Sequence, residues 1–212
     1  MADKKQQQKE QLRVRLKTSK IVRAVAKKTQ QKKPANKKTN DFKNKFYSAL
    51  NEAIVLPENS QSEFTQDDRR WAETKLGGDS PTGKPQIYIN DAKFLKSNAG
   101  SNYRKDMLIG EGLHLIKKID PDRAEKLYNT AVKDPSTLRW LEDSYMREKE
   151  SGEKRPFTDW VKNSRLDQII GGYLLGGKNS SIPTMRNWPT EKLPYGKTFK
   201  AEIEKLKKDL DI

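Results

Sequence analysis

Apolar residues in this chain recur mostly three or four positions apart, which is the spacing of one face of a helix. Only residues 86–90 (QIYIN) alternate, with Ile87 and Ile89 separated by polar positions, so this segment predicts a strand. The remaining pattern predicts helices over residues 41–56, 65–76, 103–119, 121–131, 135–151, 157–175 and 198–211. We therefore expect a mainly α fold, a compact helical body with one short strand or hairpin.

The first forty residues follow a different pattern. Residues 12–28 form one weak amphipathic stripe, made of Val14, Thr18, Ile21, Val22 and Val25. β-Branched residues are poor helix formers, so we expect this stripe to fold only on a partner. The chain should then divide into a disordered or partner-ordered basic arm, residues 1–40, and a helical body, residues 41–212, that folds without the arm.

Charge sharpens this division. The chain carries +15 in total, and residues 1–40 hold 14 Lys and Arg against two acids, giving 14 − 2 = +12. Positive charge at this density predicts binding to a polyanion, because neutralised phosphates release counterions. We expect non-specific phosphate contacts with nucleic acid from Arg13, Arg15, Lys17, Lys20, Arg23, Lys27, Lys28, Lys32, Lys33, Lys37 and Lys38. The alternatives are a passive solvated tail, a nuclear localisation signal and, more weakly, an anionic membrane surface.

Composition excludes several classes of protein. The absence of cysteine excludes a disulfide framework, a cysteine nucleophile and a thiolate metal site. No apolar run approaches the roughly 20 residues that span a bilayer, and the N-terminus lacks the apolar core of a signal peptide. We therefore expect no membrane span, no secretion through a signal peptide, and a location in the cytoplasm or in a virion.

One segment has candidate chemistry. In LIGEGLH, residues 108–114, Glu111 and His114 stand at the positions of Glu and the second His of the His-Glu-x-x-His motif. Residues 86–145 thus resemble a zincin metallopeptidase domain in degenerate form, of the kind seen in bacteriophage virion proteins. The resemblance implies a third ligand on a later helix, at Glu142 or Asp143.

The first ligand position of this motif holds Gly110, and His114 is the only histidine. A catalytic zinc site usually has three protein ligands and a water. We therefore expect no metal, no cofactor and no catalytic residue. The competing interpretation is that Glu111 and His114 are ordinary helix residues, and that Gly110 and Gly112 allow another helix to pack closely.

Three hypotheses follow. The first is a non-enzymatic structural or packaged protein that contacts DNA or RNA, such as a bacteriophage virion component among other proteins of a larger assembly. The second is an atypical zincin-like metallopeptidase. The third is a basic protein bound to ribosomes or chromatin.

Overall fold

The computed structural model describes residues 2–30, 37–59, 64, 72–96, 101–176 and 195–212. The chain divides into two compact units. Unit 1 comprises residues 1–35 and 44–115, and unit 2 comprises residues 36–43 and 116–212. Helices dominate the described residues and a small sheet accompanies them, which confirms the predicted fold class.

Unit 1 contains a three-stranded sheet with the order β1-β3-β2, formed by Ile54–Val55, Gln86–Ile89 and Ala72–Lys75, respectively. β1 runs parallel to β3, with Ile54 opposite Ile87, and β2 runs antiparallel to it. The strand predicted at residues 86–90 is confirmed. It is the central strand of the sheet, and its Ile87 side chain is fully buried.

β2 corrects one prediction. The pattern of residues 65–76 predicted a helix, but residues 72–75 pair along their whole length with β3. Pairing with a buried neighbouring strand overrides the weak local preference of such a short segment. The rest of that predicted helix, residues 65–71, lies outside the described residues.

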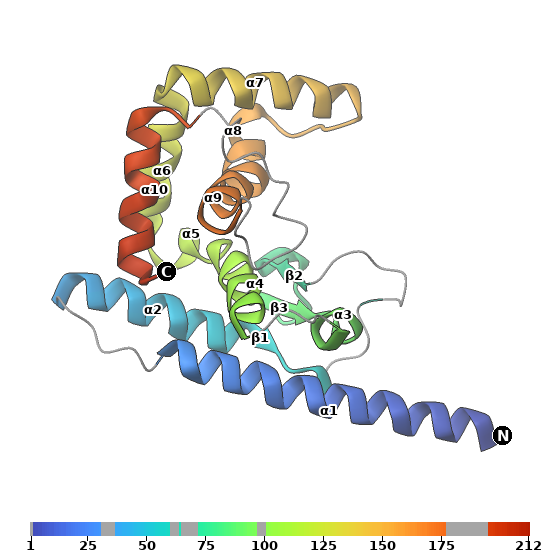
Figure 1. Ribbon diagram of the computed structural model, residues 1–212. Helices are drawn as coiled ribbons and strands as arrows, with labels where there is room; N and C mark the ends of the chain where they lie inside the picture. The colour runs from blue at the N-terminus through green and yellow to red at the C-terminus, as the bar shows by residue number, and fades with distance from the viewer. Residues whose placement is uncertain (1, 31–36, 60–63, 65–71, 97–100, 177–194) are drawn as a thin grey trace. The chain divides into compact units, whose positions relative to one another are not determined.

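The helices of unit 1 surround this sheet (Figure 1). They are α1 (Ala2–Gln30), the C-terminal part of α2 (Lys37–Ala53), α3 (Asp91–Lys96) and α4 (Ser101–Leu113), with short 3-10 turns η1 (Pro57–Asn59) and η2 (Gly77–Asp79). α1 contacts η1, α3 and α4, and α4 also contacts β2. Within unit 1, α1 therefore packs against α3, α4 and η1, and α4 connects this layer to the sheet.

α1 contains the predicted amphipathic stripe, and the stripe faces inward. Thr18, Val22 and Val25 are buried, whereas Val14 and Ile21 are partly exposed. These buried side chains contribute to the core of unit 1, which comprises residues 1–35 and 44–115.

Unit 2 is helical throughout its described part. Its helices are α5 (Ile116–Ile119), α6 (Pro121–Lys133), α7 (Pro135–Glu150), α8 (Phe157–Trp160), α9 (Leu166–Leu175) and α10 (Lys197–Leu210). α6 contacts α5, α7 and α10, and α10 also contacts α9. The core of the unit includes Leu127, Ala131, Leu141, Trp160, Val161, Ile169, Ile170, Phe199, Ile203, Leu206 and Leu210.

Two helix starts in unit 2 follow the sequence closely. Asp120 and Asp134 are N-caps, each followed by a proline at the first helical position. The predicted helix over residues 157–175 is interrupted by a π-helical turn, η3 (Val161–Arg165). Gly171 and Gly172 lie buried within α9. Among the described residues, no helix is long and apolar enough to cross a membrane.

Candidate nucleic-acid interface

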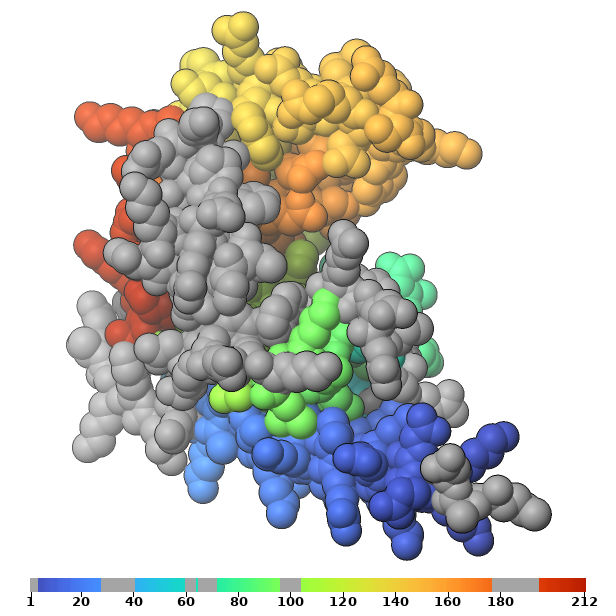
Figure 2. Space-filling view, turned by 45° about the vertical axis from the view of Figure 1, so that its right-hand side comes forward, coloured from blue at the N-terminus to red at the C-terminus, as the bar shows by residue number. Residues whose placement is uncertain are grey.

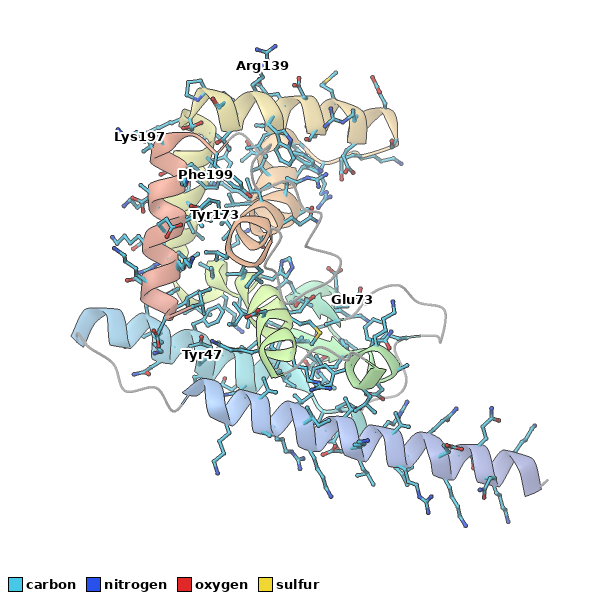
Figure 3. All side chains as sticks on the ribbon, viewed as in Figure 1. Tyr47, Glu73, Arg139, Tyr173, Lys197 and Phe199 are labelled. Atoms are coloured by element: carbon cyan, nitrogen blue, oxygen red, sulfur yellow. The ribbon has the colours of Figure 1, made fainter. Side chains whose placement is uncertain are left out.

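The largest net positive charge of any described helix lies on α1. Between Lys4 and Lys27 this helix has nine basic residues and one acid, Glu10. Eight of the nine basic residues are exposed, and Arg15 is partly exposed. Figure 2 shows the blue side chains of α1 standing along one edge of unit 1, and Figure 3 shows them pointing away from the ribbon.

The basic residues of α1 share a face. At about 100° per residue, seven of them fall within an arc of about 120° opposite the buried stripe. These seven are Lys5, Lys9, Arg13, Lys17, Lys20, Arg23 and Lys27. A rise of about 1.5 Å per residue spreads this cationic face over roughly 33 Å. The face is therefore long, one-sided and open to solvent.

Two arginines tie α1 to the rest of unit 1. Arg23 forms an ion pair with Glu58 of η1, and the Arg15 Nε lies 3.9 Å from the Asp91 Oδ2 at the start of α3. The Arg23 side chain nevertheless remains 60% exposed. The other six residues of the cationic face have no ion-pair partner among the described residues. Their charge is therefore available to an external anion.

As far as the structure describes the chain, the seam beneath α1 includes three polar side-chain atoms without a hydrogen-bond partner, beside the apolar stripe. Asp91 Oδ1, Glu58 Oε2 and Ser19 Oγ are buried without a hydrogen-bond partner among the described residues. Burial raises the pKa of Asp91 from 3.8 to about 6, and the nearby Arg15 guanidinium only partly opposes this shift. The attachment of α1 thus combines a buried apolar stripe with a polar edge that is only partly hydrogen-bonded within the described ranges.

The structure brings together only part of the predicted set of basic residues. Arg13, Arg15, Lys17, Lys20, Arg23 and Lys27 all lie on α1, with Arg15 turned toward α3. Lys28 belongs to α1, and Lys37 and Lys38 belong to α2, but the structure describes only the backbone of these three residues. Lys32 and Lys33 lie outside the described residues.

Lys4, Lys5 and Lys9 also lie exposed on α1, although they were not among the predicted basic contacts. Their segment is rich in glutamine and lacks an apolar stripe, so its pattern gives no sign of a helix that packs on a core. The available signal was the spacing of Lys5, Lys9, Arg13 and Lys17, which recur every four residues along one helical face.

The zincin-like segment has a different geometry from its motif. Gly110 and Glu111 lie on α4, but this helix ends at Leu113, and His114 occupies the turn before α5. The Glu111 carboxylate accepts a hydrogen bond of 2.6 Å from the Thr74 hydroxyl, which ties α4 to β2. Glu111 therefore has a structural partner in unit 1. No group of three His, Asp or Glu residues that could hold a metal occurs within the described ranges.

Close packing of α4 against α2 explains why α4 has a glycine at position 112. A Cβ added there would lie 2.7 Å from the Phe46 Cζ and 3.3 Å from the Leu50 Cδ1, both on α2. This contact confirms, for Gly112, the interpretation that the glycine allows another helix to pack closely. Glu142 and Asp143, the proposed later ligands, are exposed on α7.

Comparisons with protein-family models, with curated proteins and with solved structures find no match to this chain.

Proposed function

We propose that this protein is a non-enzymatic, nucleic-acid-associated protein that contacts phosphates through the cationic face of α1. The observation that supports this function is the one-sided row of seven basic residues, six of which have no ion-pair partner among the described residues. Such a row attracts a polyanion because each neutralised phosphate releases a condensed counterion.

The packing of α1 favours this function over a passive tail. A solvated tail needs no fixed geometry, whereas the buried Thr18, Val22 and Val25 hold the cationic face in one orientation. Fixed orientation lowers the ordering entropy that a flexible arm loses on binding. The surface is therefore pre-organised for an extended anion.

We propose a structural or packaged role for the protein within a larger nucleic-acid-containing assembly, such as a bacteriophage virion. The virion setting rests on the zincin-like resemblance of residues 86–145 and on the overall character of a basic chain without cysteine. The phosphate-binding surface itself does not depend on that setting.

The test is the salt dependence of binding, measured by fluorescence anisotropy with the full chain and a labelled duplex of about 20 base pairs. Six phosphate contacts give a slope of log K against log salt of about −5 for B-form DNA. In the variant Lys17→Ala/Lys20→Ala the slope should become shallower by about 2.

The matched control is Lys205→Ala/Lys208→Ala, which removes the same charge from exposed positions of α10. This control should leave the slope close to that of the parent. A slope near zero for the parent would contradict the assignment to α1. The same change of slope in both double variants would also contradict it.

A further inference from the structure

The N-terminal part of α1 has no packed face. Every residue from Lys4 to Arg13 is exposed, and the first fully buried side chain of the helix is Thr18. Figure 1 shows this end of α1 extending past α3 with no other element of unit 1 beside it. Ten residues of helix, about 15 Å, are thus accessible from all sides.

A helix that is polar all round needs an external source of stability. In this segment, Lys5, Lys9 and Arg13 recur every four residues, and like charges at that spacing destabilise a free helix. A polyanion that flanks the helix on two sides removes this repulsion. The sequence therefore suits a helix that is surrounded by phosphates.

The residues are arranged unevenly around this helix. At about 100° per residue, Gln8 and Leu12 share one side, and Glu10, the only acid of the segment, lies opposite. Lys4 and Lys9 lie on the two flanks between these sides. Leu12 is 54% exposed, so an apolar side chain points outward on the side away from the acid.

We propose that residues 4–13 of α1 enter the major groove of double-stranded B-form DNA, with Gln8 and Leu12 toward the base edges and Lys4 and Lys9 toward the phosphates of the two strands. The proposal rests on the proposed function and names its partner. Helix and groove match in size, since a helix with side chains is about 10–12 Å wide and the groove about 12 Å. Glu10 then faces solvent, away from the DNA.

The chemistry of these side chains selects A·T pairs. A glutamine amide pairs with the N6 and N7 atoms of adenine, and an apolar side chain contacts the C5-methyl group of thymine. The major groove of A-form RNA is too deep and narrow for side chains to read. A single strand cannot flank the helix on both sides. Phosphate contacts still supply most of the affinity, with a modest preference for A·T-rich duplex added.

The experiment compares four labelled probes with the full chain at fixed salt: an A·T-rich DNA duplex, the same duplex with uracil in place of thymine, the matching RNA duplex, and one DNA strand. The DNA duplex should bind about tenfold tighter than the RNA duplex or the single strand. Replacing thymine by uracil should weaken binding by the parent, and Leu12→Ala should abolish this sensitivity.

Gln8→Ala should weaken binding to the DNA duplex about tenfold, as loss of a bidentate base contact does. Gln6→Ala is the matched control, because it changes the same residue type on the side of Glu10, and it should have no effect. If the two variants lose the same affinity for the DNA duplex, the proposed orientation of the helix in the groove is wrong. If the RNA duplex or the single strand binds as tightly as the DNA duplex, with steep salt dependence, groove entry is wrong and the proposed function stands. If no probe binds, both fail.

Discussion

The close approach of α4 to α2 gives the sharpest prediction of stability. Gly112 is buried, and an alanine Cβ there would lie 2.7 Å from the Phe46 Cζ. Phe46 is 0% exposed and packs edge-on against Tyr47, with ring centroids 5.3 Å apart. The phenyl ring is therefore enclosed by protein on all sides and cannot swing out into solvent.

Two opposing effects set the magnitude of Gly112→Ala. Alanine is favoured over glycine in a helix by about 1 kcal/mol. Overpacking a filled core lowers stability by roughly 1–3 kcal/mol. Because Phe46 is enclosed, we expect the clash to win, with a net loss of about 1 kcal/mol in the free energy of unfolding.

The assay is urea unfolding of the full chain followed by far-ultraviolet circular dichroism. Gly78→Ala is the control, since Gly78 is exposed in η2 and its added Cβ would meet nothing within 4 Å. In a Phe46→Leu background, which lacks the Cζ atom, Gly112→Ala should lose much of its destabilising effect. If Gly112→Ala stabilises the parent chain by the amount that helix propensity alone provides, the close-packing explanation is refuted.

Three further outcomes are expected. Burial raises the pKa of Asp91 to about 6, so between pH 4 and 6 the folded state binds more protons than the unfolded state. The free energy of unfolding should therefore fall as pH rises through this window. In thermal unfolding, Asp91→Asn should flatten that slope. Asp134→Ala removes the carboxylate that caps α7 through the Thr137 N–H, and should lower the unfolding free energy in urea by about 1 kcal/mol, whereas Asp134→Asn keeps an acceptor. Glu111→Gln keeps an acceptor for Thr74, so melting temperature and nucleic-acid affinity should stay unchanged; a proteolytic activity lost in this variant would instead support a peptidase.

The helices were predictable because their patterns are long and local. The stripe of α1 and the face of α2 around Phe46 follow helical spacing, and Asp120-Pro121 and Asp134-Pro135 mark helix starts through capping. These signals act over one or two turns, so they can be detected without knowledge of tertiary contacts.

The remaining features depend on distant parts of the chain. Ala72–Lys75 is a strand because β3 lies beside it. The π-helical turn at Val161–Arg165 has no local sequence pattern that distinguishes it from an α-helix. The amphipathic stripe of α1 showed that this helix needs a partner, but its sequence does not say whether that partner is internal. The charge of the candidate site and its confinement to one helical face were predictable from the sequence, whereas the attachment of that helix to unit 1 became visible only in the packing of Thr18 and Val22.

Hydrogen–deuterium exchange of the full chain, with and without a DNA duplex, tests the central claim most directly. Unbound, the amides of residues 4–13 should exchange fast, because this helical segment has no packed face in unit 1. With DNA, protection should rise across α1 from Lys4 to Lys27 and change little in α10, which also carries exposed lysines. Protection of α10 equal to that of α1, or unchanged exchange in α1 at saturating DNA, would contradict the account.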